Sequence, residues 1–345
     1  MIRSTTTGTL KSYNYNLQRS TYNLNKSRNT VLTGRNFNSF SEDPAVANRC
    51  FQLRRSYTKV NSQHAVGQSV VRKYEVAWST LDGVSQSLHT AGENSALTAI
   101  IRGTSGSTAS GRSALGQELC RVAEDIVRTM NAKYGDNFVF AGADGLNVPL
   151  NLEDGTLTYR GLNVDDPQNF IDLQNLDQNE KKFVDIGLGM QEVEQNKLLE
   201  SSAFDAALHG IHFLGYGTDE DGDPKNVVSL LNRMGEILKN CDADGNFAEE
   251  GDKEELCRLL DKYQLATENF SNKYTELDTR ASFLKSNQVQ LENNAYILQE
   301  QIVEMEDADP AEAITAFSWA QYCYNSALKV GNSILSESLM DYLNT

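Results

Sequence analysis

Apolar residues recur every seven positions through much of the last third of the chain. Between residues 256 and 305, steps of four and three residues alternate, and only Thr267 and Gln288 interrupt the apolar series. The positions are Leu256, Leu260, Tyr263, Thr267, Phe270, Tyr274, Leu277, Ala281, Leu284, Gln288, Leu291, Ala295, Leu298, Ile302 and Met305. This repeat predicts a long helix whose narrow apolar stripe must be covered by another helix.

A matching repeat near the other end of the chain offers the partner for this helix. It comprises Val46, Cys50, Leu53, Tyr57, Val60, His64, Gly67, Val71, Tyr74, Trp78, Leu81, Ser85 and Leu88. The segment Ser41-Glu42-Asp43-Pro44 predicts the start of the first helix, because it supplies a polar cap and a proline in the first turn. Asp309-Pro310 predicts the end of the second helix, or a kink in it.

Two shorter amphipathic stretches flank these helices at the ends of the chain. Their apolar stripes consist of Leu10, Tyr13, Leu17, Leu24 and Val31 in the first, and Phe317, Tyr324, Leu328, Leu335, Leu339 and Tyr342 in the second. The order of elements is therefore palindromic, which predicts a hairpin with the two ends of the chain together. We expect these terminal stripes to form an assembly interface.

The middle of the chain has a different pattern. Residues 146–159 alternate apolar and polar positions around Asp154-Gly155, which predicts a β-hairpin, and residues 183–186 predict a short strand. Residues 227–239 have helical periodicity. The predicted fold is thus mainly α, a long antiparallel coiled-coil helical bundle formed by the N- and C-terminal segments, with a small inserted α+β domain.

These patterns predict three parts. Residues 1–40 and 311–345 form terminal assembly helices, residues 41–140 and 256–310 form a coiled-coil rod domain, and residues 141–255 form an inserted, β-rich outer domain.

Charge is distributed unevenly along the 345 residues, whose formal net charge is −16. Residues 1–140 contain 17 basic and 9 acidic residues, and residues 1–40 contain no acidic residue. Residues 256–345 contain 6 basic and 13 acidic residues, and the middle segment 141–255 contains 8 and 25. Opposite charge on the two helical arms favours their association.

Composition and motifs give little support to membrane insertion or catalysis. No stretch approaches the ~20 apolar residues of a membrane span. The N-terminus lacks the apolar segment of a cleaved secretory signal. The five cysteines are scattered without a CxxC pair, and Cys50 fits a small buried side chain. We find no HExxH, GxSxG or paired catalytic carboxylates, so we expect neither an enzyme nor a cofactor.

Candidate metal and phosphate motifs are weak. His209-x-x-His212 could place two imidazoles together, but the nearby glycines argue against a helix, and no further ligand completes a zinc set. Residues 242–246 and 219–224 resemble the start of calcium loops, yet Asp-Gly turns explain both. The glycine-rich segment 103–111 lacks the ending of a phosphate loop and predicts a flexible link. We interpret His64 as a packed polar residue that sets the helix register.

Several motifs resemble the flagellin superfamily, and within it the family of type-3 hook-associated proteins, which join hook to filament. The N-terminal part of the resemblance comprises Leu24-x-x-Ser27, Val31-Leu32-Thr33-Gly34-Arg35 and Ser41-Glu42-Asp43-Pro44-Ala45. Asn137-Phe138-Val139-Phe140-Ala141-Gly142 resembles the type-3 version, and the stretch from Ala327-Leu328-x-x-Gly331 to Leu343 is compatible with it. The resemblance covers roughly residues 1–142 and 256–345.

The resemblance implies a structural subunit of the bacterial flagellum, outside the cell. Such proteins leave the cell through the flagellar type III export channel without a cleaved signal peptide, and they assemble into a ring or tubular layer. The implied partners are a neighbouring hook-associated protein, flagellin and an export chaperone. Two alternatives remain open: a filament flagellin, or a soluble coiled-coil scaffold or adhesin with an acidic recognition domain. The basic N-terminal residues could contact nucleic acid, but their heptad spacing favours helix pairing instead.

Overall fold

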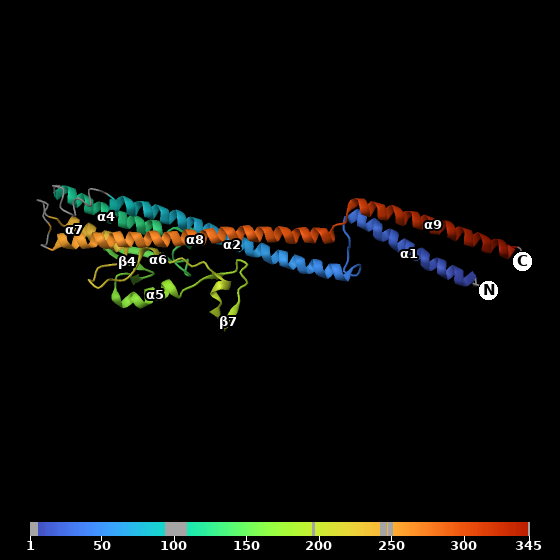
Figure 1. Ribbon diagram of the computed structural model, residues 1–345, viewed down its shortest axis with the longest axis horizontal. Helices are drawn as coiled ribbons and strands as arrows, with labels where there is room; N and C mark the ends of the chain where they lie inside the picture. Colours follow the sequence, from blue (N-terminus) through green and yellow to red (C-terminus); the bar gives the residue numbers. More distant parts are fainter. Residues whose placement is uncertain (1–5, 94–108, 195–196, 242–246, 248–250, 344–345) are drawn as a thin grey trace. The chain divides into compact units, whose positions relative to one another are not determined.

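The computed structural model describes residues 6–93, 109–194, 197–241, 247 and 251–343. The helices are α1 (Thr6–Thr33), α2 (Pro44–Glu93), α4 (Ala109–Met130), α5 (Phe170–Gln178), α6 (Gly210–Leu214), α7 (Val227–Lys239), α8 (Asp252–Glu306) and α9 (Pro310–Leu343) (Figure 1). The fold is mainly α, as predicted, and the strands are short. Among the helices described, none has the length and apolar character needed to cross a membrane.

The chain divides into two compact units. The terminal unit comprises residues 1–61 and 292–345, and the central unit comprises residues 62–291. The long helices α2 and α8 each contribute to both units. The domain boundaries predicted from the sequence, at residues 140 and 255, remain a prediction.

The starts of the helices follow from their capping residues. Asp43 Oδ1 accepts a hydrogen bond from the Val46 amide at 3.0 Å, so α2 begins with Pro44 in its first turn. Asp309 Oδ1 accepts one from the Ala311 amide at 2.7 Å, and Pro310 is the first residue of α9. Both predicted helix boundaries are therefore confirmed.

The predicted apolar stripe of α8 is largely confirmed. Within the central unit its buried residues include Leu256, Leu260, Tyr263, Phe270, Leu277, Ala281, Leu284 and Leu291. The Tyr263 hydroxyl donates a hydrogen bond of 2.8 Å to the carbonyl oxygen of Leu88, which fixes α8 against the end of α2. Gln288 was predicted to lie on this stripe, but its neighbour Asn287 is more deeply buried. Gln288 is half-buried and lies close to Gly67.

The predicted stripe of α2 is correct in the terminal unit and shifted by one residue at alternate positions in the central unit. The buried stripe there consists of Gln63, Gly67, Val70, Tyr74, Ala77, Leu81, Val84, Leu88 and Ala91, and Thr80 is buried beside it. The spacing is three and again three residues from Tyr57 through Val60 to Gln63, which changes the phase of the repeat. His64 is only half-buried, and Trp78, which is 41% exposed, lies on the flank with its ring 6.0 Å from that of Tyr274.

The central unit also contains the strands and the remaining helices. The strands are β1 (Lys133–Tyr134), β2 (Asn137–Phe138), β3 (Leu150–Glu153), β4 (Thr156–Tyr159), β5 (Leu162–Asn163), β6 (Phe183–Val184), β7 (Glu192–Glu194), β8 (Lys197–Leu198) and β9 (Phe204–Asp205). They form one three-stranded antiparallel sheet, β3-β4-β5, and three two-stranded pairs, β1-β2, β6-β9 and β7-β8.

The predicted secondary structure of the middle segment is confirmed where the structure describes it. Strands β3 and β4 pair Leu150 with Tyr159 and join through Asp154 and Gly155, both with positive φ, as a two-residue hairpin turn requires. Helix α7 has the predicted bounds. The predicted link at 103–111 lies largely outside the described residues, and the motif at 242–246 lies outside them entirely.

One hydrophobic core connects the middle segment to the long helices. Buried residues of α2, α4, α7 and α8 form a single cluster with strand residues such as Leu157 and Tyr159. Helices α4 and α7 approach closely because Gly116 and Gly235 face each other, with no room for a side chain at either position. The described residues of the middle segment therefore share one core with the long helices.

Candidate assembly interface

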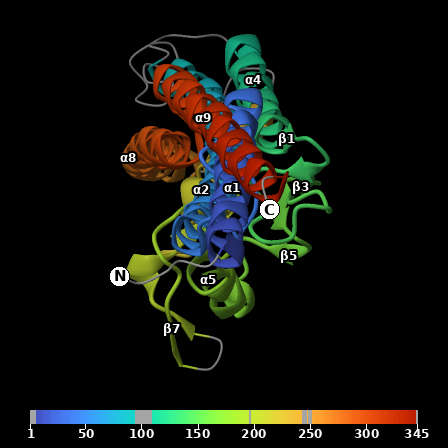
Figure 2. The same ribbon diagram turned by 90° about the vertical axis from the view of Figure 1, so that its right-hand side faces the viewer.

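The terminal unit pairs the two ends of the chain. Helices α1 and α9 run side by side (Figure 2). The inward positions of α9 are spaced by four and three residues: Ala313, Phe317, Ala320, Tyr324, Ala327 and Gly331. Several of them are small, so the helices can approach closely. The phenol of Tyr13 lies over Gly331, where even a β-carbon would collide with it.

Most of the predicted terminal stripe lies on this seam. Leu10, Tyr13, Leu17, Leu24, Phe317 and Tyr324 are half-buried. Val31 and Leu328 are instead exposed, by 38% and 42%. The side chains of Leu335, Leu339 and Tyr342 are not among those that the structure describes. The heptad positions thus serve first to pair the two ends of one chain, and whether they also contact other subunits stays a proposal.

A second set of apolar side chains in the terminal unit faces outward. Tyr15 and Tyr22 on α1 and Trp319 and Tyr322 on α9 are each at least 60% exposed. The Trp319 and Tyr322 rings stack on each other, with centroids 5.9 Å apart. Clusters of large exposed apolar side chains are unusual on a protein that remains alone in water and commonly mark a contact surface. The sequence analysis missed these residues because they lie outside the heptad positions that it followed.

Hydrogen bonds join the connection between α1 and α2 to the connection between α8 and α9 in the terminal unit. Gly34, with φ +68°, ends α1 and accepts a hydrogen bond of 2.9 Å from the Ala308 amide. The Asn36 side chain donates to the carbonyl oxygens of Met305 and Asp307, at 3.2 and 3.0 Å. Arg54 Nε donates to Glu306 Oε1 at 2.7 Å. The two connections are therefore held to each other rather than left as independent loops.

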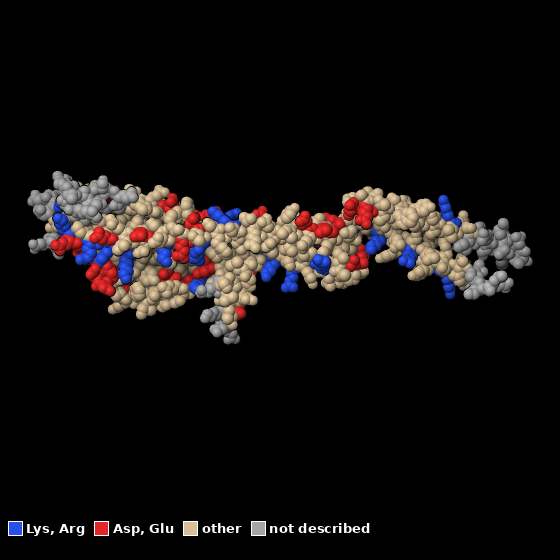
Figure 3. All heavy atoms as spheres, viewed as in Figure 1, with Lys and Arg blue, Asp and Glu red and all other residues tan. Residues whose placement is uncertain are grey.

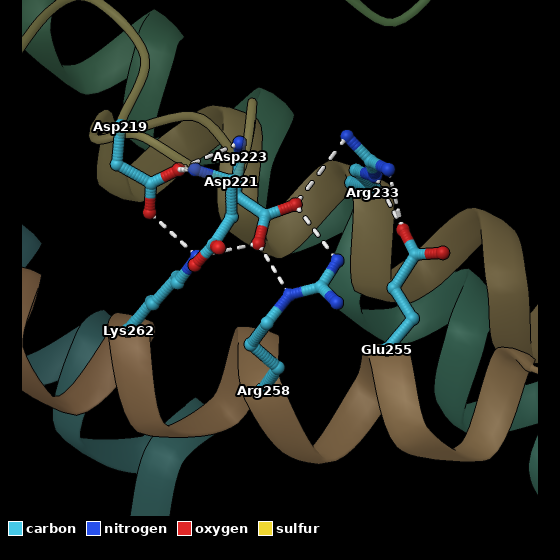
Figure 4. A network of polar contacts seen from close by, with 7 residues as sticks. All are labelled: Asp219, Asp221, Asp223, Arg233, Glu255, Arg258 and Lys262. Carbon is cyan, nitrogen blue, oxygen red and sulfur yellow. Dashed lines mark hydrogen bonds and ion pairs between the residues drawn. The ribbon is translucent and has the colours of Figure 1, made fainter.

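The aspartate motif at 219–223 is a turn neutralised by basic residues. Asp219 Oδ1 accepts from the amides of Asp221 and Asp223 at 3.0 and 2.9 Å, and Gly222 has φ +81°. The Lys262 ammonium contacts all three carboxylates, and Arg258 Nε lies 2.7 Å from Asp223 Oδ2 (Figure 4). Because the ammonium occupies the place where a cation would sit, the site does not favour a metal ion.

The same network shifts the acidity of its members. Burial alone would raise the pKa of Asp223, which is only 1% exposed, but hydrogen bonds from Arg258 and Lys262 outweigh burial and hold it below the ordinary value. Desolvation would lower the pKa of Lys262, yet its hydrogen bonds to the three aspartates raise it. Arg233 bridges this network to Glu255, with 2.7 Å between Nε and Oε1 (Figure 4). These groups link the turn to α7 and α8.

The two histidines considered as a metal pair, His209 and His212, have separate partners. His209 immediately precedes α6 and is buried, with Nε2 3.0 Å from the carbonyl oxygen of Glu180. His212 lies within α6, and its Nδ1 is 2.9 Å from Asp177 Oδ1. A short helix does form here, contrary to the expectation, but it does not bring the two rings to one ligand.

Comparisons with known proteins identify the fold. Neither a protein-family model nor a curated protein matches the chain. Among solved structures, a candidate flagellar hook-associated protein from Vibrio parahaemolyticus matches with a TM-score of 0.53 and 17% identity, over 77% of this chain and 100% of the other. Hook-associated protein 3 from Legionella pneumophila matches at 0.50 and 12%, over 74% and 98%. FlgL from Xanthomonas campestris matches at 0.50 and 11%, over 73% and 99%.

Proposed function

We propose that the chain is a structural subunit of the bacterial flagellum that joins hook to filament. The observation that carries this proposal is the terminal unit, in which paired helices leave large aromatic side chains in water. A fold shared with solved hook-associated proteins, over the full length of those chains, supports it. The N-terminal motifs and the sequence around Asn137 to Gly142 point the same way.

In this role the chain has no catalytic task. It leaves the cell through the type III export channel without a cleaved signal peptide, escorted by an export chaperone. Outside the cell it assembles into a ring or tubular layer between a neighbouring hook-associated protein and flagellin. The interface comprises the predicted terminal stripes together with the exposed aromatic residues of α1 and α9.

The test uses a flagellated bacterium that naturally encodes this chain and from which the gene has been deleted. The strain is complemented with the wild-type chain, with Leu24→Asp, or with Asn25→Asp as a matched control. Leu24 is half-buried on the α1 side of the seam, whereas Asn25 is exposed on the same helix. A carboxylate at Leu24 costs roughly 1–3 kcal/mol of pairing free energy, because it loses hydration without gaining a hydrogen-bond partner.

We expect immunogold to label the wild-type chain at one spot between hook and filament. Leu24→Asp should be exported but should retain no filament, so flagellin appears in the medium, while Asn25→Asp should swim normally. Label along the whole filament would favour a filament flagellin. Motile filaments with Leu24→Asp would remove α1 from assembly and favour a soluble scaffold or adhesin.

A further inference from the structure

The long helices of the terminal unit carry two exposed stripes of opposite charge. Each stripe has an aromatic residue followed at intervals of four by two residues of like charge. The basic stripe, on α2, is Phe51, Arg55 and Lys59, and the acidic stripe, on α8, is Tyr296, Glu300 and Glu304. Residues four apart lie on one face of a helix, so each stripe forms a continuous ridge.

Both ridges point away from the partner helix. In this part of α2 the half-buried positions are Leu53, Tyr57 and Val60, and at 100° per residue Arg55 lies opposite their mean direction. Phe51 and Tyr296 are exposed by 70% and 66%. Figure 3 shows basic side chains along the outer edge of the first part of α2 and acidic ones along the last part of α8.

The four charged groups form no ion pair with any residue in the described part of their own chain. Arg55, Lys59, Glu300 and Glu304 are all exposed and form no ion pair there. Arg54, by contrast, lies on the side of α2 between this ridge and α8, and it forms an ion pair with Glu306. The terminal unit therefore offers one unpaired basic edge and one unpaired acidic edge.

The two edges match in height along the helices. Within one chain Arg54 lies level with Glu306, and the Tyr57 hydroxyl is 3.5 Å from Gln299 Oε1. Since α2 and α8 are antiparallel, these two contacts place Arg55 within about one helical turn of the height of Glu304, and Lys59 within about one turn of that of Glu300. If a second copy lay beside the first at the same height, the two basic groups of one copy would face the two acidic groups of the other.

We propose that the basic stripe binds the acidic stripe of a second copy of this chain. The contact is heterologous, because different surfaces meet, and its repetition builds a ring or tube rather than a closed dimer. It rests on the proposed function in that it requires copies side by side. It differs from that proposal in its location, which is on α2 and α8 rather than on the terminal helices.

Zero-length coupling with a carbodiimide tests the contact directly. The reagent activates a carboxylate, a lysine amine attacks it, and an amide forms as the urea leaves with the carboxylate oxygen and the amine loses a proton. We expect mass spectrometry of the full-length chain to find a Lys59–Glu300 linked peptide. Mixing ¹⁵N-labelled and unlabelled chains should give mixed-isotope pairs, which prove that the link joins two molecules.

Charge reversal supplies the second arm. Arg55→Glu/Lys59→Glu and Glu300→Lys/Glu304→Lys should each lose the link and weaken self-association on the order of tenfold in sedimentation velocity, because like charges then meet. An equimolar mixture of the two variants restores complementary edges and should recover association. Arg72→Glu/Arg121→Glu changes the net charge by the same amount as Arg55→Glu/Lys59→Glu, at exposed sites of the central unit, and should leave self-association unchanged. Circular dichroism verifies that all variants fold.

The outcomes separate this inference from the proposed function. A dominant link from Lys59 to another carboxylate, an intramolecular link only, or failure of the mixture to recover would overturn the lateral contact. If the reversed variants still complement the deletion strain with junction labelling, the contact is wrong and the flagellar role stands. If wild-type chains link through these stripes but never label the flagellum, the contact stands and the role is wrong.

Discussion

Replacing Gly116 by alanine should destabilise the central unit, although alanine is the better helix former. A β-carbon at Gly116 would lie 2.6 Å from the carbonyl oxygen of Gly235 and 2.7 Å from the amide nitrogen of Lys239. An ordinary contact begins at 3.4 Å, so α4 and α7 would have to separate by about 0.8 Å. Both obstacles are backbone atoms, which cannot rotate away as a flexible side chain could.

The expected size follows from two opposing contributions. Forcing extra volume into a packed core costs about 1–3 kcal/mol, and the upper end applies because Leu115, Leu119 and Leu238 around the crossing are buried and would lose contact. The higher helix propensity of alanine relative to glycine offsets about 1 kcal/mol of this loss. We therefore expect a net loss of about 2 kcal/mol in the free energy of unfolding.

Gly83 on α2 is the matched control, because a β-carbon there meets no atom within 4 Å. Gly83→Ala should stabilise by up to about 1 kcal/mol. Urea unfolding followed by fluorescence measures both variants in a Trp319→Phe background, where the remaining Trp78 reports the central unit. If Gly116→Ala were as stable as its background, the close crossing of α4 and α7 would be refuted.

Two further predictions concern charged groups of the central unit. Lys262→Met leaves Asp223 buried with only its arginine contacts, so the unit should lose about 3 kcal/mol at pH 7, and millimolar Ca²⁺ should raise the melting temperature of this variant but not of the wild type. Equal responses to Ca²⁺ would contradict the idea that the ammonium fills the cation position. Burial, and then the charge of Lys182, lower the pKa of Lys73 to about 8. The unfolded chain therefore binds more protons between that pH and the ordinary pKa near 10.5, and stability should rise from pH 7.5 to 9.5. Lys73→Met should remove that rise in parallel thermal melts, and an unchanged slope would assign it to another group.

Long-range regularity explains what the sequence analysis predicted well. A helix such as α8 repeats its pattern over many turns, so isolated exceptions at Thr267 and Gln288 do not obscure its period or its ends. The hairpin turn at Asp154-Gly155 and the helix caps at Asp43 and Asp309 are local, and each depends on a few neighbouring residues. Such features follow from a short stretch of sequence, whatever the rest of the chain does.

Features that depend on distant partners were not predictable in the same way. Lys262 lies about forty residues beyond the aspartate turn that it neutralises, and no local pattern marks it as the partner. The exposed aromatic residues Trp319 and Tyr322 were missed for a related reason. A tyrosine or tryptophan on an amphipathic helix can face either the seam or water, and only the position of the partner helix decides which.

The shifted stripe of α2 shows how a correct period can give a wrong face. In its central part apolar residues stand in adjacent pairs, Val70 with Val71 and Ala77 with Trp78, so two stripes fit the same spacing. The structure buries Ala77 completely and leaves Trp78 on the flank of α2. Where α2 packs closely on its neighbours, there is room for a methyl group but not for an indole ring. The phase changes at Gln63, whose amide donates to both carboxylate oxygens of Asp185, at 3.1 and 3.0 Å. A polar residue thus enters the stripe because a loop from the middle segment supplies its partner, and the heptad pattern contains no information about that loop.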